Sequence, residues 1–211
     1  MLYRPLFFTS FLIDDYLGEA GLDEAATVVL ASASSKTAFG TAHLLSQRDE
    51  VRVVGLTSAS NVDFVSGLGC YDQVLTYDDG ASLPDGPAMF VDLSGDPAVV
   101  QAVHERYGDD LLLSSAVGLT HWERFGQRTA PLPGPPQELF FAPARVEKRR
   151  TDWGPGVLED RLATAWTPFL DLAADRVQIE HVSGPDAVAA TWTALVDGRA
   201  DPSRARILHT H

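Results

Sequence analysis

The feature that most constrains the fold is a regular alternation between short apolar runs and segments with helical periodicity. The apolar runs span residues 27–31, 51–56, 73–76, 88–91 and 111–115. Between them, helices are predicted after Ser35, over 61–68, and from Pro97 to Gly108. Parallel strands need such long crossovers, and continuous apolar strands are typical of a sheet covered on both faces. The alternation therefore predicts an α/β fold with a doubly wound parallel sheet.

The composition changes after Thr129, where closely spaced prolines mark a loop. Beyond the loop, we predict a helix over 157–174, a strand over 177–182, a helix over 185–197 and a last short strand at 207–208. We therefore divide the chain into an N-terminal lead-in helix (1–26), a sheet core (27–128) and a C-terminal elaboration of the same domain (129–211).

The charge balance limits the possible partners. The chain of 211 residues has 16 basic and 29 acidic side chains, which give a net charge of -13. We therefore expect no nucleic-acid partner and no membrane partner, since binding to phosphate backbones depends on clustered Lys and Arg. The one basic run, Lys148 to Arg150, is interpreted as a solvated surface.

The single cysteine and the N-terminus indicate the compartment. Cys70 has no partner for an internal disulfide, and we interpret it as a small apolar packing residue. The apolar run 6–13 is too short to span a bilayer and has no basic start or cleavage site of a signal peptide. We expect a cytoplasmic protein.

The stretch VLASASSKTAFG, residues 29–40, lies where a strand passes into a helix and suggests a phosphate-binding turn of one of two kinds. An ATP-type P-loop requires glycines at the positions of Leu30 and Ser35, so only the Lys36-Thr37 pair matches that motif. Leu30 belongs to the strand, which argues against the P-loop. A kinase or ATPase remains the minor alternative.

The second kind is a Rossmann-type dinucleotide turn, which must follow a strand and open a helix. The position fits, although small residues replace the glycines. The helix N-terminus still offers free N–H groups to a pyrophosphate, Ser34 and Ser35 offer hydroxyls, and Lys36 offers a full charge. The alternative is that the serines only cap the helix.

The end of the second strand indicates the cofactor. A carboxylate at this position binds the ribose diol and repels a 2′-phosphate, but the chain has the neutral donors Thr57, Ser58 and Asn61 there. This favours NADP(H) over NAD(H).

The order of the segments resembles a known superfamily. The segments VVLASASSKTAFGTAHLL, VRVVGLTSASNVDFVSGLGCYDQVLTYDD, AMFVDLSGDPAVVQAVHERYG and LLLSSAVGLTHWE are similar, in this order, to the cofactor domain of quinone-oxidoreductase-like medium-chain dehydrogenases/reductases. Within that superfamily, the stretches RPLFFTSFLIDDYL, SASSKTA and FFAPARVEKR resemble the DUF2855 group. The resemblance implies that 27–128 is a Rossmann-like dinucleotide-binding core.

The resemblance also implies a nucleotide at the carboxyl ends of the strands. The expected cofactor-binding residues are Ser32, Ser34, Ser35, Lys36 and Thr37 at the pyrophosphate, Thr57, Ser58 and Asn61 at the adenosine ribose, Asp92 and Ser94 (with Leu93) beside the adenine, and Ser115 and Val117 (with Ala116) near the nicotinamide. Their ordinary role would be to satisfy backbone groups at strand ends.

The chain departs from the superfamily at its N-terminus. Superfamily members carry a GroES-like lobe ahead of the cofactor domain, whereas Met1 stands close to the first strand. The resemblance therefore implies that this lobe is missing, by truncation or natural loss. A homodimer or a partner chain would then have to close the pocket around a small-molecule substrate.

Catalytic residues are harder to predict. His121 follows the fifth strand near the expected nicotinamide and is the candidate proton donor. We predict no metal site, since only His209 and His211 are spaced for one and they lie at the chain end. Two hypotheses follow: an NADPH-dependent reductase of a carbonyl or activated alkene, or a non-catalytic, degenerate dinucleotide-binding or protein-interaction module.

Overall fold

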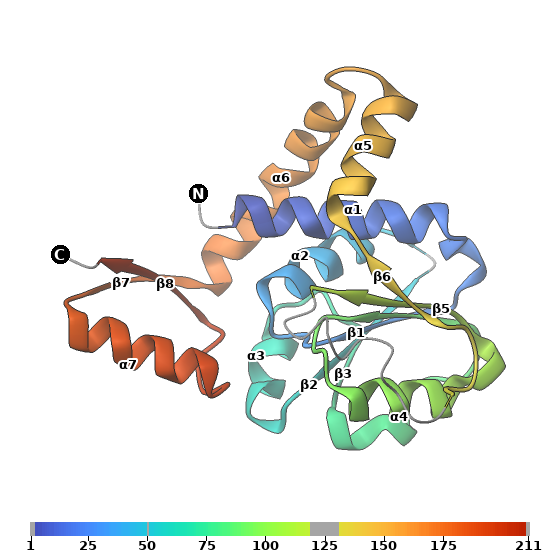
Figure 1. The fold of residues 1–211 in the computed structure, drawn as a ribbon, viewed down its shortest axis with the longest axis horizontal. Helices are drawn as coiled ribbons and strands as arrows, with labels where there is room; N and C mark the ends of the chain where they lie inside the picture. Colours follow the sequence, from blue (N-terminus) through green and yellow to red (C-terminus); the bar gives the residue numbers. More distant parts are fainter. Residues whose placement is uncertain (1–2, 50, 119–130, 210–211) are drawn as a thin grey trace.

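Six parallel strands form the central sheet of the computed structural model, which describes residues 3–49, 51–118 and 131–209. The sheet has the order β3-β2-β1-β4-β5-β6 (Figure 1). The strands are Thr27–Ala31 (β1), Arg52–Thr57 (β2), Gln73–Thr76 (β3), Ala88–Asp92 (β4), Leu111–Val117 (β5) and Gln137–Phe140 (β6). The predicted doubly wound α/β sheet is confirmed. β6 extends the sheet beyond the five strands that the sequence predicted.

Each face of the sheet has its own core, because successive side chains of a strand point to opposite faces. Val28 and Leu30 pack with α1 (Arg4–Glu19) and α2 (Lys36–Leu45) on one face. Val29 packs with α4 (Pro97–Tyr107) on the other face. A short helix, α3 (Val62–Gly67), connects β2 to β3. Cys70 is buried in the first core, and burial raises the pKa of its thiol to about 12, so its expected packing role is confirmed.

The helix α6 (Val157–Arg176) binds α1 and α2 together through one aromatic side chain. Phe169 is fully buried, and its ring lies 4.5 Å from the ring of Phe7 and 5.2 Å from that of Phe39, centroid to centroid. Since an aromatic pair contributes about 0.5–1.5 kcal/mol beyond its burial, this cluster is a main anchor of α6. The observed helix matches the predicted 157–174 and contains Pro168.

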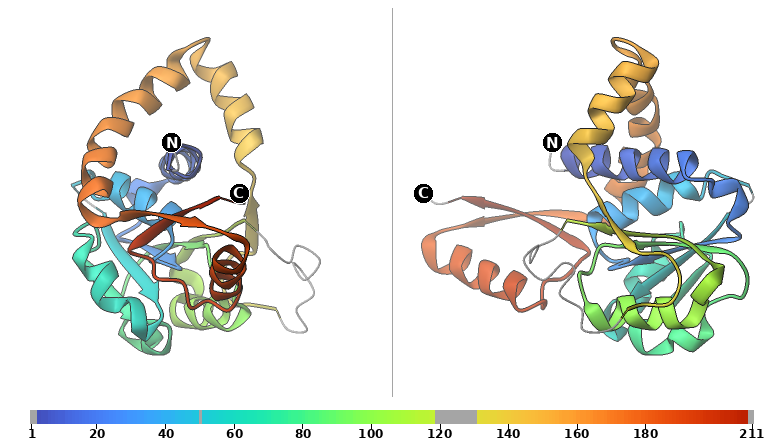
Figure 2. Two further views of the ribbon diagram at one scale, coloured as in Figure 1. Left: turned by 90° about the vertical axis from the view of Figure 1, so that its left-hand side faces the viewer. Right: turned by 45° about the vertical axis from the view of Figure 1, so that its right-hand side comes forward.

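The helices α5 (Ala142–Trp153) and α6 form an arch over α1, and α1 runs through the arch (Figure 2). α5 was not predicted from the sequence. The spacing of its basic residues places Arg145, Lys148 and Arg149 on one face of the helix, toward Asp15 and Glu19 of α1.

The prediction that the basic run Lys148 to Arg150 is a solvated surface is therefore wrong for Arg149. Its side chain is 10% exposed, and its Nε lies 2.6 Å from a carboxylate oxygen of Asp15. It also pairs with Glu19 and Asp152. Three carboxylates offset the cost of burying this guanidinium, and a sequence run of charges does not show such a long-range pairing.

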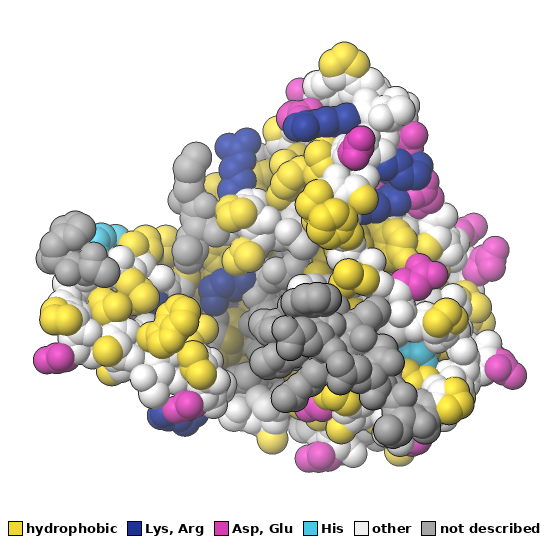
Figure 3. Space-filling model, in the orientation of Figure 1, with side chains coloured by type: hydrophobic (Ala, Val, Ile, Leu, Met, Phe, Trp, Pro, Cys, Tyr) yellow, Lys and Arg dark blue, Asp and Glu magenta, His cyan; other side chains and the backbone are white. Residues whose placement is uncertain are grey.

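A second, smaller sheet stands apart from the main sheet. The parallel strands β7 (Gln178–Ser183) and β8 (Arg204–His209) are joined by α7 (Pro185–Val196), and this βαβ unit extends to the left in Figure 1. The structure thus lengthens the short strand predicted at 207–208. The unit has four exposed large apolar side chains among the described residues: Ile179, Trp192, Leu195 and Val196. Figure 3 shows apolar side chains gathered on the face of this unit toward the viewer. Within the described residues, no helix is both long enough and apolar enough to cross a membrane.

The α1–α2 contact predicts a strong effect of Gly40→Ala. A Cβ at Gly40 would lie 2.6 Å from the Oγ of Ser10 and 3.3 Å from Phe7. Ser10 cannot move freely, because its hydroxyl donates to the Thr37 carbonyl at 2.8 Å. Overpacking of this kind costs about 1–3 kcal/mol, so urea unfolding should show a loss of that size. Gly67→Ala in α3 is the matched control, since a Cβ there meets nothing within 4 Å. Equal stabilities of the two variants would contradict the packing argument.

The arch predicts a pH dependence of stability. Hydrogen bonds from Lys148 and Arg145 lower the pKa of Glu19 from 4.5 to about 2. A depressed carboxyl pKa gives stability that is fully present above pH 4.5 and is lost as the pH falls toward 2. In Glu19→Gln, the melting temperature should fall less steeply over that range and be lower at neutral pH. Glu147→Gln, at a residue with no ion pair in the described chain, should follow the wild type. Parallel curves for Glu19→Gln and the wild type would disprove the assignment.

Candidate functional site

The candidate site lies at the carboxyl edge of the main sheet. All six strands are parallel, so the segments that follow β1, β2, β4 and β5 meet at this edge. The strand order reverses between β1 and β4, and in open α/β sheets ligands bind at such a switch point. The turn between β1 and α2 stands there, as the sequence predicted.

The turn has the geometry of a glycine turn although it contains none. Ser32 has a φ of 56°, in the left-handed region that non-glycine residues rarely adopt. The N–H of Ser35 donates to the Ser32 carbonyl at 2.8 Å. The hydroxyl of Ser35 then caps α2 by accepting from the N–H of Ala38 at 3.2 Å. Capping by a serine is therefore present, and the helix N-terminus still faces the switch point with its positive end.

Close packing against β2 holds the turn. Ala33 lies over Gly55, where an added Cβ would be 2.9 Å from the Ala33 Cβ and 2.9 Å from the Tyr71 ring. The Tyr71 hydroxyl donates to the Ala33 carbonyl at 3.0 Å, and burial raises the pKa of Tyr71 well above its ordinary value. The sequence signal for this contact is the glycine inside β2, which indicates close approach of another segment.

The residues after β2 are partly joined to the turn. The amide Nδ2 of Asn61 donates to the Ser34 hydroxyl at 3.2 Å. Ser58 and Ser60 share a hydrogen bond at 3.1 Å. The Oγ1 of Thr57 is buried and has no partner within the described residues. A buried hydroxyl without a partner is costly, so Thr57 is a position at which a ligand would recover a hydrogen bond.

The polar side chains near the ends of β4 and β5 differ in whether they have hydrogen-bond partners. Asp92 is 3% exposed and accepts hydrogen bonds from Ser94 N–H (2.9 Å), the Ser94 hydroxyl (2.7 Å) and Gly95 N–H (3.0 Å). The hydrogen bonds between Asp92 and Ser94 thus hold the loop after β4 in its conformation. Ser115, by contrast, is 1% exposed, and its hydroxyl has no partner within the described residues. Val117 ends β5 and is half-buried.

Lys36 links the turn to the smaller sheet. Its Nζ donates to the carbonyl of Arg204 at 3.4 Å, at the start of β8. Burial, together with the nearby charge of Arg206, lowers the pKa of Lys36, and Asp201 opposes this shift. Arg206 itself pairs with Glu180 at 3.0 Å. Two cations from distant parts of the chain therefore lie near the N-terminus of α2, while the neighbouring Thr37 is half-buried. No pattern in the sequence predicted that Arg206 lies near Lys36.

A pocket of about 380 Å³ opens beside the turn on the β2 and β3 side. Ser58, Tyr77, Asp78 and Asp96 contribute to its lining, and among the described residues Ser58 is the only sequence-predicted site residue that does so. Burial raises the pKa of Tyr77 above its ordinary value, and Ser32 of the turn lies close enough to the Tyr77 hydroxyl to oppose this shift. Tyr77 thus joins this pocket to the turn.

His121 and His211 lie outside the described residues, so the structure does not place the predicted proton donor. His209 hydrogen-bonds His181 across β7 and β8, with 2.9 Å between the two ring nitrogens. No group of three or more metal-ligating side chains gathers within residues 3–49, 51–118 and 131–209.

Comparison with protein families gives one match. A family described as "Protein of unknown function (DUF2855)" matches residues 1–201. No curated protein matches the sequence.

Solved structures share the fold over nearly the whole chain. YhdH from Escherichia coli K-12 with bound NADPH is 18% identical, with a TM-score of 0.61, and the match covers 98% of this chain and 61% of that one. CurA from Vibrio vulnificus in complex with NADPH is 16% identical, with a TM-score of 0.62 and coverages of 97% and 62%. A putative NADPH:quinone reductase from Mesorhizobium loti is 14% identical, with a TM-score of 0.64 and coverages of 97% and 58%. The chain thus spans about three fifths of these structures.

The contact that holds the turn predicts a difference between two tyrosine variants. Tyr71→Phe removes the donor to the Ala33 carbonyl and should lower the free energy of unfolding by about 1–3 kcal/mol. Tyr107→Phe is the matched control, because the Tyr107 hydroxyl is buried without a partner in the described chain. That variant should be as stable as the wild type or more stable. Urea unfolding of both measures the difference, and a destabilised Tyr107→Phe beside an unchanged Tyr71→Phe would reverse the argument.

Proposed function

The chain belongs to the DUF2855 family, and we propose that it is an NADP(H)-dependent oxidoreductase, or the cofactor-binding part of one, that reduces a carbonyl or an activated alkene. The observation that carries the proposal is the β1–α2 turn at the switch point of the sheet, with Ser32 in the left-handed region and the positive end of α2 facing the switch point. The fold shared with three structures whose names include NADPH supports the choice of cofactor.

The cation pair beside the turn fits the pyrophosphate. Lys36 is largely desolvated and lies near Arg206, and both effects lower its pKa. An anion between the two would remove their repulsion and give Lys36 a partner stronger than the Arg204 carbonyl, which it reaches only at 3.4 Å. In the proposed complex, Ser32, Ser34, Ser35 and Thr37 line the phosphates with Lys36.

The unpartnered hydroxyls fit the two ends of the cofactor. Thr57, with Ser58 and Asn61, would bind the adenosine ribose and its 2′-phosphate without a carboxylate at the end of β2 to repel it. Ser115, with Val117, would meet the nicotinamide end. Asp92 and Ser94 would support the cleft mainly by holding the loop after β4 in place.

The chemistry itself would come from the cofactor, which supplies a hydride when bound. The part of this chain is to hold the phosphates, orient the ring at the end of β5 and keep water from the buried side of the cleft. His121 remains the proposed proton donor to the reduced substrate.

A non-catalytic dinucleotide-binding or interaction module is the second candidate function. The exposed apolar side chains of β7 and α7 favour it, since a helix apolar on its outer face is typical of a surface that another polypeptide covers. The same surface supports the expected homodimer or partner chain under the reductase proposal. Turnover separates the two candidates.

Titration of the purified chain with NADPH, NADH and ATP tests the proposal. NADPH should bind most tightly, and Lys36→Ala should raise its Kd about tenfold or more, because hydrogen bonds to charged groups contribute about 1.5–3 kcal/mol. Lys148→Ala, which removes the other lysine of the chain from the distant arch, is the matched control and should leave the Kd unchanged.

The outcomes divide the hypotheses. Consumption of bound NADPH by quinones, enones or aldehydes would establish the reductase, whereas binding without turnover of any of these would support the module. Absence of binding by both nicotinamide nucleotides would refute the cofactor proposal, and binding of ATP alone would favour the P-loop alternative.

A further inference from the structure

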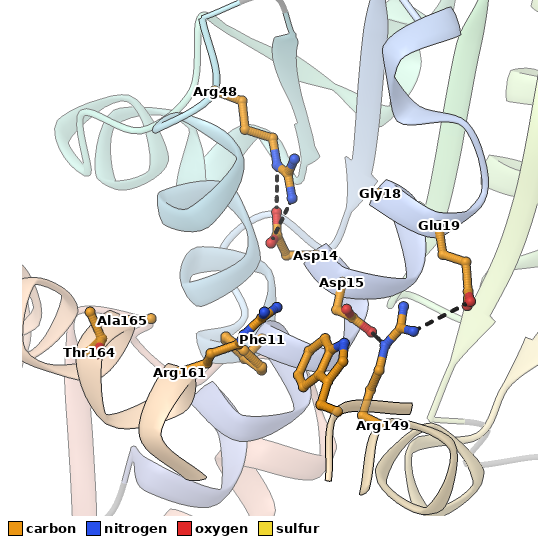
Figure 4. Close-up of a pocket in the computed structure, with 11 residues that line it drawn as sticks. Phe11, Asp14, Asp15, Gly18, Glu19, Arg48, Arg149, Arg161, Thr164 and Ala165 are labelled. Atoms are coloured by element: carbon orange, nitrogen blue, oxygen red, sulfur yellow. Dashed lines mark hydrogen bonds and ion pairs between the residues drawn. The ribbon is translucent and has the colours of Figure 1, made fainter. Parts of the chain in front are cut away.

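A second cavity, of about 560 Å³, lies under the arch and is separate from the phosphate turn. Figure 4 shows that its walls come from α1, α5 and α6, with Arg48 following α2. None of the residues predicted to bind the cofactor lines it. Its volume is within the range of about 300–1,000 Å³ that is typical of small-molecule sites.

The carboxylates of this cavity already have partners. Both oxygens of Asp14 accept from Arg48 at 2.9 Å. Asp15 lies 2.6 Å from Arg149, and Glu19 lies 2.7 Å from Lys148. These pairs fix the charges in the wall, so neither these carboxylates nor Arg48 and Arg149 are available to a ligand without loss of an existing ion pair.

Arg161 is different, because it makes no ion pair with any residue of the described chain. Its guanidinium carbon lies 4.2 Å from the centre of the Trp153 ring, and Figure 4 shows the side chain directed toward Phe11. Stacking engages the face of a guanidinium and leaves its N–H donors free in the plane. The cavity therefore presents a planar fork of donors next to aromatic side chains.

We propose that this cavity binds a small aromatic monocarboxylate. Arg161 accepts the carboxylate through two parallel N–H···O bonds, the geometry that arginine favours. The guanidinium groups of Arg149 and Arg161 already lie over the Trp153 ring, at 5.0 and 4.2 Å from its centre. The ring of the ligand therefore packs against Phe11 and Ala165, in the apolar part of the lining.

The charges of the wall match a ligand with a single negative charge. The lining carries three carboxylates, those of Asp14, Asp15 and Glu19, and each of them has a cationic partner. Arg161 has no ion pair in the described chain, so one carboxylate on the ligand balances its charge. The cavity thus differs in ligand class from the phosphate turn, where Lys36 lies near a second cation, Arg206.

Indole-3-acetate and its neutral amide, indole-3-acetamide, test the proposal as a matched pair of probes in calorimetric titrations. Indole-3-acetate should bind saturably, and the amide should bind about tenfold more weakly or less, since it lacks the charge. NADPH should not compete with indole-3-acetate.

Two variants place the probe in the cavity. Arg161→Gln should weaken indole-3-acetate binding about tenfold or more, whereas Arg176→Gln, an exposed arginine in the last turn of the same helix, should not. Ala165→Leu fills the apolar wall and should also prevent binding.

Three results would overturn the proposal: equal affinities for the acid and the amide, an unchanged affinity in Arg161→Gln, or no saturation at about 1 mM, a concentration that corresponds to only about 4 kcal/mol of binding free energy. Circular dichroism of each variant confirms that it is folded, so a loss of binding reports on the cavity.

Discussion

The candidate site depends on the close packing of Ala33, Gly55 and Tyr71. A methyl group at Gly55 would lie 2.9 Å from both neighbours, so no other residue fits there without movement of the turn or of the ring. This contact brings the turn down onto β2, while the Tyr71 hydroxyl fixes its carbonyl direction. The left-handed Ser32 and the free N-terminus of α2 follow from it, because the chain must reverse between β1 and the helix in very few residues. Backbone strain of about 1–3 kcal/mol at such a residue persists only where the surroundings hold it.

The sequence was sufficient for the elements whose partners are local. The strands β1 to β5 and the helices α2, α4, α6 and α7 show their periodicity in uninterrupted segments, and their predicted ends lie close to the observed ones. β6 and α5 were missed for a physical reason. β6 is a four-residue edge strand with two exposed residues, which shows no burial pattern. α5 is rich in charged residues, and its most buried side chain is that of Arg149. Its partners are acidic residues more than a hundred positions away, and a pattern within one segment cannot reveal them.

In the candidate site too, features that depend on local sequence were predictable, and features that depend on tertiary contacts were not. The turn was predictable from its place between a strand and a helix, and the sequence placed Ser35, Lys36 and Asn61 at the ends of adjacent elements, where the structure has them. Their part in binding a cofactor stays a prediction. Tyr77 and Arg206 were not identified, because their relevance depends on tertiary contacts. Tyr77 reaches Ser32 from beyond β3, and Arg206 approaches Lys36 only because β8 packs near the N-terminus of α2. His121, placed beside the nicotinamide by resemblance alone, remains a prediction.

The acidity of the chain makes the local arrangement of charge decisive. A net charge of -13 repels a dinucleotide at long range, so long-range attraction does not assist its approach. Ionic screening restricts that repulsion to about 8 Å at physiological salt, whereas Lys36 and Arg206 act at contact distance and, for Lys36, from a desolvated position. A charge pair is stronger in such surroundings than at an open surface. Under the proposed function, affinity for a phosphate ligand therefore depends on whether β8 stays near the turn, and the smaller sheet is part of the proposed cofactor site although it shares no strand with the main sheet.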